Sequence, residues 1–92
     1  MSMLDDAAIT QRLAALPEWK RDGAWIRRTW TFPSFTDGIA FANRVAEAAE
    51  KADHHPDILI EYKKVTLSLT SHDSGGLTDR DFRLAARLDA LA

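Results

Sequence analysis

All three histidines of the chain fall in two short segments. His54 and His55 lie within Glu50-Lys51-Ala52-Asp53-His54-His55-Pro56, and His72 lies within Thr70-Ser71-His72-Asp73. The imidazole of histidine has an unperturbed pKa of about 6.5, so it can accept or release a proton near neutral pH. The clustering therefore predicts a chemical role for these two segments.

The backbone around the histidine pair is predicted to be extended. Pro56 disfavours helical backbone at His55, so a preceding helix must end before it. Neighbouring side chains in extended chain point in roughly opposite directions, which gives His54 and His55 different surroundings. The simplest interpretation is that both only terminate a helix, where the helix dipole favours a cation, and that His72 is an exposed turn residue.

Two other interpretations give the histidines a chemical role. One is a zinc ion bound by the three histidines, completed by Asp53 or Glu50. It is the less favoured, because adjacent residues in extended chain converge poorly on one ion. The other is acid–base catalysis without a metal, in which imidazoles exchange protons with a ligand. The histidine pattern alone leaves these alternatives open.

The composition describes one small globular domain spanning residues 1–92. Hydrophobic residues make up 46% of the chain and charged residues 28%, as in ordinary soluble proteins. The formal net charge is -2 and the basic residues are dispersed along the sequence, which argues against direct nucleic-acid binding. A chain of this length has little apolar surface to bury on its own, which favours self-association.

Two absences limit the chemistry and the cellular location. The chain has no cysteine, which excludes disulfides, a thiolate nucleophile and a cysteine-ligated zinc site. No stretch approaches the roughly 20 apolar residues of a membrane span, and residues 1–6 lack the basic and apolar runs of a signal peptide. We therefore expect a cytoplasmic protein that does not bind membranes.

Hydrophobic periodicity and turn signals predict elements in the order α-β-β-α-β-β-α. Asp22-Gly23 and Lys63-Lys64 mark the turns of two hairpins, and Thr78 with Asp81 forms a capping box that opens the last helix. The predicted helices cover residues 4–16, 34–52 and 78–91, and the predicted strands cover residues 19–21, 24–32, 58–62 and 65–71.

Hairpins separated by helices predict an α+β fold: a four-stranded antiparallel sheet with three helices packed on one face. A hairpin that bends at Lys63-Lys64 returns His72 to the start of the strand that follows His54 and His55. We therefore expect the three imidazoles to meet near one end of the sheet. The open edges of such a sheet can pair with a second copy of the chain.

The residues around the histidines closely resemble the signature of the pterin-4a-carbinolamine dehydratases. The resemblance rests on residues 50–56, Tyr62, residues 69–73, residues 76–78 and the pair Arg80-Asp81, with matching spacing throughout. It extends over nearly the whole chain, since the order of elements is also similar to that of the family. A match in many parts is far more specific than a lone histidine pair.

The resemblance implies that the protein dehydrates 4a-hydroxytetrahydropterin to quinonoid dihydropterin, which regenerates the pterin cofactor after aromatic amino acid hydroxylation. The pterin is then the substrate, and neither a cofactor nor a metal is implied. Loss of water needs one proton delivered to the 4a-hydroxyl and one removed from N5, which suits histidine. The implied partners are the pterin, further copies in a homodimer or homotetramer, and an aromatic amino acid hydroxylase of the same pathway.

The resemblance also implies roles for individual residues. His54, His55 and His72 are the implied catalytic residues, with His55 as the leading acid or base. Glu50 is expected to orient the histidines, and Asp81 to support His72 as well as to cap its helix. The residues implied to line the pterin pocket are Asp53, Thr70, Ser71 and Asp73.

One residue departs from the family's pattern. Ile58 stands where many members carry an aromatic residue, two places after Pro56, which changes one wall of the pocket but removes no proton-transfer group. The alternative function is that of a non-catalytic protein-binding relative, such as a transcriptional coactivator or an assembly factor. The clustered histidines favour the enzyme, because a partner protein has no physical need for them.

Overall fold

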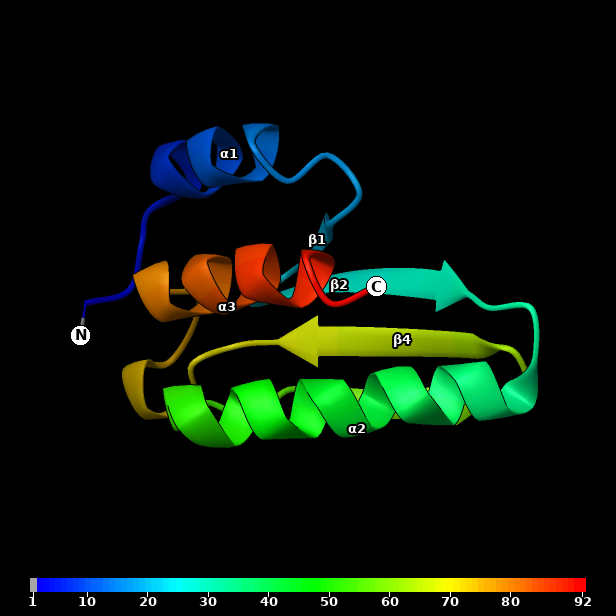
Figure 1. The fold of residues 1–92 in the computed structure, drawn as a ribbon. Helices are drawn as coiled ribbons and strands as arrows, with labels where there is room; N and C mark the ends of the chain where they lie inside the picture. The colour runs from blue at the N-terminus through cyan, green and yellow to red at the C-terminus, as the bar shows by residue number, and fades with distance from the viewer. Residues whose placement is uncertain (1) are drawn as a thin grey trace.

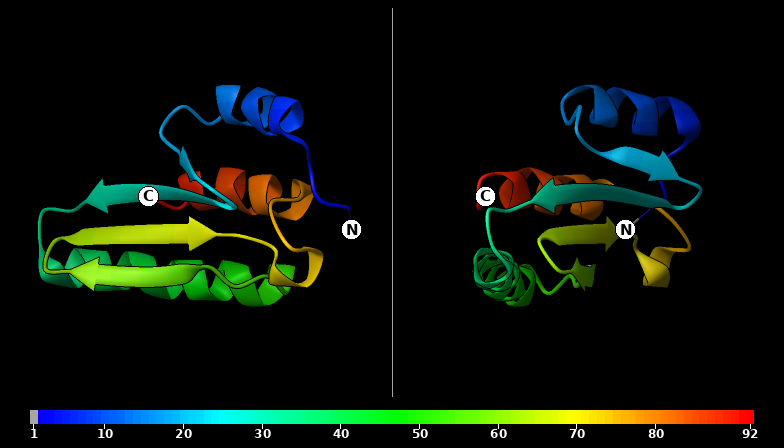
Figure 2. Two further views of the ribbon diagram at one scale, coloured as in Figure 1. Left: turned by 180° about the vertical axis from the view of Figure 1, so that it is seen from behind. Right: turned by 90° about the vertical axis from the view of Figure 1, so that its right-hand side faces the viewer.

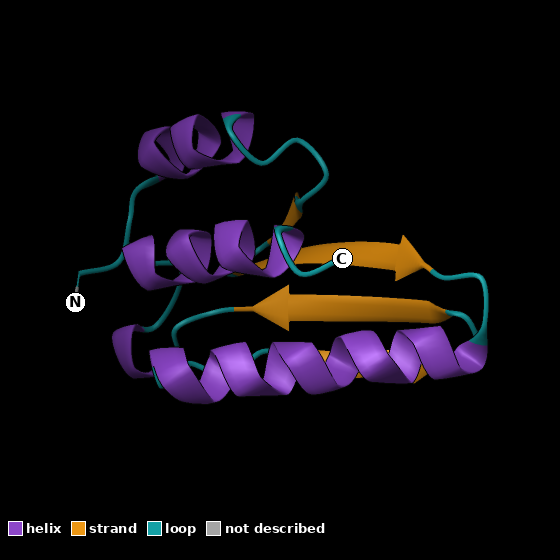
Figure 3. Ribbon diagram, in the orientation of Figure 1, coloured by secondary structure: helices purple, strands orange, loops and turns teal. Residues whose placement is uncertain are grey.

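The protein, described for residues 2–92 by a computed structural model, has the predicted order of elements (Figures 1 and 3). Its elements are α1 (Asp6–Ala14), β1 (Lys20–Asp22), β2 (Trp25–Thr31), α2 (Phe35–Ala52), β3 (Asp57–Glu61), β4 (Lys64–Leu69), the 3-10 turn η1 (His72–Ser74) and α3 (Asp79–Asp89). The predicted α+β class is confirmed, and the element bounds differ from the predicted ones by a few residues.

The strands form one antiparallel sheet in the order β1-β2-β4-β3. In the β3–β4 hairpin Asp57 lies opposite Ser68 and Glu61 lies opposite Lys64. This register places the residues before β3 next to the residues after β4. The segment that holds His54 and His55 therefore lies at the same end of the sheet as the segment that holds His72, as predicted.

The core lies between the sheet and its helices. Val65, Leu67 and Leu69 alternate along β4 and are fully buried, while the intervening residues point to the other face. Helices α2 and α3 lie across one face of the sheet, and from behind they are seen beyond the strands (Figure 2). Helix α1 lies next to β1, and its Ile9 is buried in the same core.

Helix α2 ends abruptly, and its ending directs the chain into the site. Asp53 adopts the left-handed conformation with φ 49°, and its backbone N–H bonds to the carbonyls of Ala49 and Glu50. The N–H of His54 also bonds to the carbonyl of Ala49, at 3.1 Å. This pattern of bonds closes the last turn of a helix. The chain therefore leaves the helix within one residue, and His54 follows directly.

Helix α3 begins with the predicted capping box. The side chain of Thr78 accepts a hydrogen bond from the helix backbone, and the side chain of Asp81 accepts one from the Thr78 N–H at 2.9 Å. Asp81 is fully buried, so this cap faces the interior of the protein. None of the helices in residues 2–92 is long and apolar enough to cross a membrane.

Candidate active site

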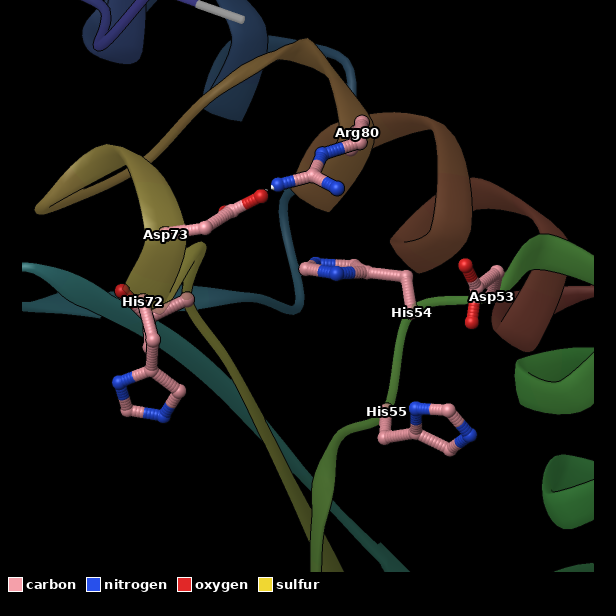
Figure 4. Close-up of a pocket in the computed structure, with 7 residues that line it drawn as sticks. Asp53, His54, His55, His72, Asp73 and Arg80 are labelled. Carbon is pink, nitrogen blue, oxygen red and sulfur yellow. Dashed lines mark hydrogen bonds and ion pairs between the residues drawn. The ribbon is translucent and has the colours of Figure 1, made fainter.

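The three histidines lie around one pocket at the end of the sheet where β3 begins and β4 ends (Figure 4). The pocket has a volume of about 260 Å³ and draws its walls from the end of α2, the segment after β4 and the first turn of α3. Its lining residues are Asp53, His54, His55, Thr70, His72, Asp73 and Arg80. The predicted convergence of the imidazoles is confirmed.

His54 is held by a buried carboxylate. Its Nε2 lies 2.6 Å from Oδ1 of Asp81, and the residue is only 8% exposed. The other oxygen of Asp81 accepts hydrogen bonds from the Ser71 hydroxyl and the Thr78 backbone N–H, both at 2.9 Å. Because a carboxylate can only accept hydrogen bonds, Nε2 of His54 carries the hydrogen and donates it.

Two predicted roles are corrected by this contact. Asp81 contacts His54, whereas the sequence predicted that it would support His72. Ser71 was predicted to line the pocket, but it is 1% exposed and its hydroxyl bonds to Asp81 and to Thr78. Strand β4 ends at Leu69, two residues earlier than predicted, but Ser71 keeps the core-facing orientation of Leu67 and Leu69. Ser71 lies behind the pocket wall.

His55 is exposed and forms only a weak pair with Glu50. Its Nε2 lies 3.3 Å from Oε1 of Glu50, which is on the last turn of α2, and the two side chains are 58% and 78% exposed. An exposed pair of this kind contributes less than about 1 kcal/mol. The predicted contact between Glu50 and a histidine is present, although Glu50 does not line the pocket. His55 can therefore turn toward a ligand at little cost.

His72 is placed by an aromatic contact. It begins η1, directly after the chain leaves β4, and its ring meets the indole of Trp25 edge to face, with 5.3 Å between centroids and 77° between planes. Within residues 2–92 its imidazole has no hydrogen-bond partner. Both ring nitrogens of His72 are therefore available to a ligand.

Arg80 is the pocket residue to which the sequence reasoning gave no role. Its Nη2 donates a hydrogen bond to Oδ1 of Asp73 across the pocket (Figure 4), while its Nε is buried without a partner. The hydrogen bond from Arg80 holds the pKa of the Asp73 carboxyl below its ordinary value of 3.8. The sequence did contain a clue to Arg80, since it stands next to Asp81 in the first turn of α3, the turn that contacts His54.

The remaining predicted lining residues lie where expected. Asp53 and Thr70 both line the pocket: Asp53 precedes β3, and Thr70 directly follows β4. The hydroxyl of Thr70 donates to the backbone carbonyl of Ala24, which ties the end of β4 to the start of β2. Thr70 is thereby fixed as a wall of the pocket, while the side chain of Asp53 is exposed at its rim.

The lining combines three imidazoles, two carboxylates and one guanidinium. Such a set can exchange protons near neutral pH and can hydrogen-bond a polar planar ligand. In the part of the chain that the structure describes, no three His, Asp or Glu side chains are arranged to hold a metal ion.

Comparison with known proteins gives the same family from sequence and from structure. The family model for pterin 4 alpha carbinolamine dehydratase matches residues 2–91. A relative from Thermomicrobium roseum, provisionally named a pterin-4-alpha-carbinolamine dehydratase, is 51% identical over 92 residues and covers 100% of this chain and 99% of its own. A relative from a Roseiflexus species with the same provisional name is 54% identical over 88 residues, covering 96% of this chain and 95% of its own.

Two solved structures extend the comparison. The transcriptional coactivator/pterin dehydratase from Brucella melitensis superposes with a TM-score of 0.94 at 30% identity, covering 99% of both chains. A pterin dehydratase-like protein, identified as a RuBisCO assembly factor of the alpha-carboxysome, superposes with a TM-score of 0.67 at 25% identity, covering 80% of this chain and 86% of its own. With a family model over nearly its full length and half of its residues shared with these relatives, the chain belongs to the pterin 4 alpha carbinolamine dehydratase family.

Proposed function

We propose that this protein dehydrates 4a-hydroxytetrahydropterin to quinonoid dihydropterin and water. The observation that carries the proposal is the meeting of three histidines around one pocket, in a chain that the family model matches over residues 2–91. The pocket offers several groups that exchange protons near neutral pH, which is what loss of water from a carbinolamine requires.

The reaction moves two protons and breaks one bond. A proton passes to the 4a-hydroxyl, the bond between C4a and oxygen breaks, and water leaves. A proton is removed from N5, so that N5 and C4a become doubly bonded and the charge balances. His55, which is exposed and weakly held, is proposed as the leading acid or base. His54 and His72 position the pterin and share the transfer of protons around the hydroxyl.

The other pocket residues are proposed to bind the pterin. Asp53, Thr70 and Asp73 present oxygens that can pair with the polar edges of the ring. Asp81 does not reach the pterin and instead fixes His54, as Glu50 does more weakly for His55. The reaction is proposed to need no metal and no cofactor, since the histidines supply the proton transfer that it requires.

The biological setting is part of the same proposal. We place the protein in the cytoplasm, where it recycles tetrahydropterin that an aromatic amino acid hydroxylase has used. We also propose that it forms a homodimer or homotetramer, because β3 is an open edge strand with exposed apolar residues.

The test is the decay of freshly generated 4a-hydroxytetrahydropterin, followed by ultraviolet absorbance in the presence of a chelator. The wild type is compared with His55→Ala, His72→Ala and the His54/His55/His72 triple alanine variant, with folding checked by circular dichroism. We expect the wild type to accelerate the decay, each single variant to lose rate, and the triple variant to lose all acceleration. If folded wild type leaves the rate of decay unchanged, the proposed dehydratase function is wrong, and the protein-binding role becomes the favoured hypothesis.

A further inference from the structure

A second cavity adjoins the candidate active site on the far side of His54. It has a volume of about 300 Å³, lies between the end of α2 and α3, and is lined by Ala52, His54, Arg80, Arg83, Leu84 and Arg87. His54 and Arg80 line both cavities, so a ligand bound among the histidines has this second cavity next to it. A substituent on that ligand can extend into it.

The second cavity is basic. Arg80, Arg83 and Arg87 follow one another at spacings of three and four along α3, which places them on one face of the helix. No acidic residue lines the cavity. The chain as a whole has a formal net charge of -2, and its basic residues are dispersed along the sequence. In the folded protein three of them nevertheless gather around this cavity.

The positive charge of this cavity is not neutralised by the protein. Arg80 is paired with Asp73, but Arg83 and Arg87 have no ion-pair partner within residues 2–92. Other arginines, such as Arg12 and Arg21, do have carboxylate partners, so pairing is common elsewhere on the surface. In addition, Nε of Arg80 is buried without a hydrogen-bond acceptor. A buried donor without an acceptor is costly, and a bound anion would remove that cost.

We propose that the ligand of this protein is a pterin whose side chain carries an anionic group, a phosphate or a carboxylate, which Arg83 and Arg87 bind in the second cavity. The proposal rests on the proposed function in that the ring of the pterin is bound among the histidines. Guanidinium groups match the geometry of phosphates and carboxylates and remain charged at all working pH values. The arginines would then select the side chain, while the histidines act on the ring.

The test compares neutral and anionic substrates with arginine variants. The substrates are the 4a-hydroxy derivatives of 6-methyltetrahydropterin, which is neutral, of tetrahydroneopterin monophosphate, and of tetrahydrofolate with its glutamate carboxylates. The variant is Arg83→Gln with Arg87→Gln. Both residues are exposed, and glutamine keeps the helix propensity. The control is Arg21→Gln with Arg27→Gln, which removes two positive charges from residues that line neither this cavity nor the candidate active site.

We expect the Arg83/Arg87 variant to lose about tenfold in kcat/KM for one of the anionic substrates, through a higher KM. The neutral substrate should change by less than about twofold in this variant, and the control should leave all three substrates within the same range. The preference for the anionic substrate should also weaken as salt is added. Which anionic substrate responds distinguishes phosphate from carboxylate. Equal losses for neutral and anionic substrates, or no loss for any, would overturn the inference.

A binding experiment separates this inference from the proposed function. If the wild type accelerates the decay of none of the substrates, the proposed function has failed, and the anion site is decided by inorganic pyrophosphate. Titration of pyrophosphate is followed through the Nε–Hε resonances of the arginines. Saturable shifts of the Arg83 and Arg87 resonances, together with a saturable shift of the Arg80 resonance that is lost in the Arg83/Arg87 glutamine variant, support the site. The absence of saturable shifts overturns it.

Discussion

At the scale of single residues, one buried carboxylate has several partners. Asp81 accepts hydrogen bonds from His54, Ser71 and the Thr78 N–H. Substitution Asp81→Asn nearly preserves the volume, but its NH2 group replaces one carboxylate oxygen and then faces a donor, either Nε2–H of His54 or the backbone N–H of Thr78. We expect the free energy of unfolding, measured in urea, to fall by about 2 to 3 kcal/mol.

The matched control for this substitution is Asp79→Asn in the same helical turn. Asp79 pairs with Arg12, and its side chain is 46% exposed, so its loss should cost less than about 1 kcal/mol. Equal effects of the two substitutions would contradict the special position of Asp81.

The ion pair between Arg80 and Asp73 should be visible in the titration of the Asp73 carboxyl. The pKa of Asp73 lies below its ordinary value of 3.8 because Arg80 donates a hydrogen bond to the carboxylate. The pair is therefore fully formed above that ordinary value and is lost as pH falls through the lowered pKa. In Arg80→Met the pKa of Asp73 should rise toward its ordinary value, as followed by carbon-13 NMR of the carboxyl. Arg83→Met, on the same helix face, should leave it where it is in the wild type.

At the scale of elements, the end of α2 holds a residue in an unfavourable conformation. Asp53 is left-handed, with φ 49°, and it also lines the pocket. Glycine adopts this conformation without the cost of about 1 kcal/mol that other residues bear. Asp53→Gly should therefore raise the free energy of unfolding by about 0.5 kcal/mol, while the loss of its carboxylate raises KM for the pterin.

Asp53→Asn separates the two effects of this substitution. Asparagine tolerates the left-handed conformation, so thermal unfolding should stay close to that of the wild type while KM rises. If the glycine variant is less stable than the wild type, the side chain of Asp53 stabilises the end of α2 by more than its left-handed backbone conformation costs.

Most elements, and the meeting of the histidines, could be predicted because local rules decide them. Thr78 and Asp81 have the spacing of a capping box, and one hairpin is enough to bring His72 toward His54, although it turns at Tyr62-Lys63, one residue before the predicted Lys63-Lys64. The partners of buried side chains could not be predicted in the same way. They depend on how α3 packs against the end of β4, which brings Asp81 to both Ser71 and His54.

The pairing of Arg80 was beyond the sequence for a related reason. Its contact with Asp73 joins the first turn of α3 to the η1 turn, and the path of the loop between them sets the distance. The grouping of Arg83 and Arg87 with His54 likewise requires knowledge of how α3 lies against the end of α2. Charge dispersed along the sequence therefore gave no sign of a basic cavity.

At the scale of the whole molecule, β3 is an open edge of the sheet. Ile58 and Leu59 of β3 are 39% and 53% exposed, and Tyr62 in the turn that follows the strand is 69% exposed. Exposed apolar residues on an unpaired edge favour association with another chain. We expect sedimentation velocity to show a dimer or tetramer, and Leu59→Lys to weaken the association by about tenfold or more.

Glu61→Lys is the control for that change, since it also adds a lysine to β3 but removes no apolar surface. It should shift the association less than Leu59→Lys does. A wild type that sediments as a monomer at all concentrations would refute the proposed self-association.

The register of the β3–β4 hairpin has a consequence for changes in chain length. Because the walls of the pocket are the residues just before β3 and just after β4, the hairpin fixes how far the His55 side stands from the His72 side. One residue inserted in either strand would shift one wall by about 3.3 Å and turn the following side chains to the opposite face. Insertions and deletions should therefore be selected against throughout residues 57–69.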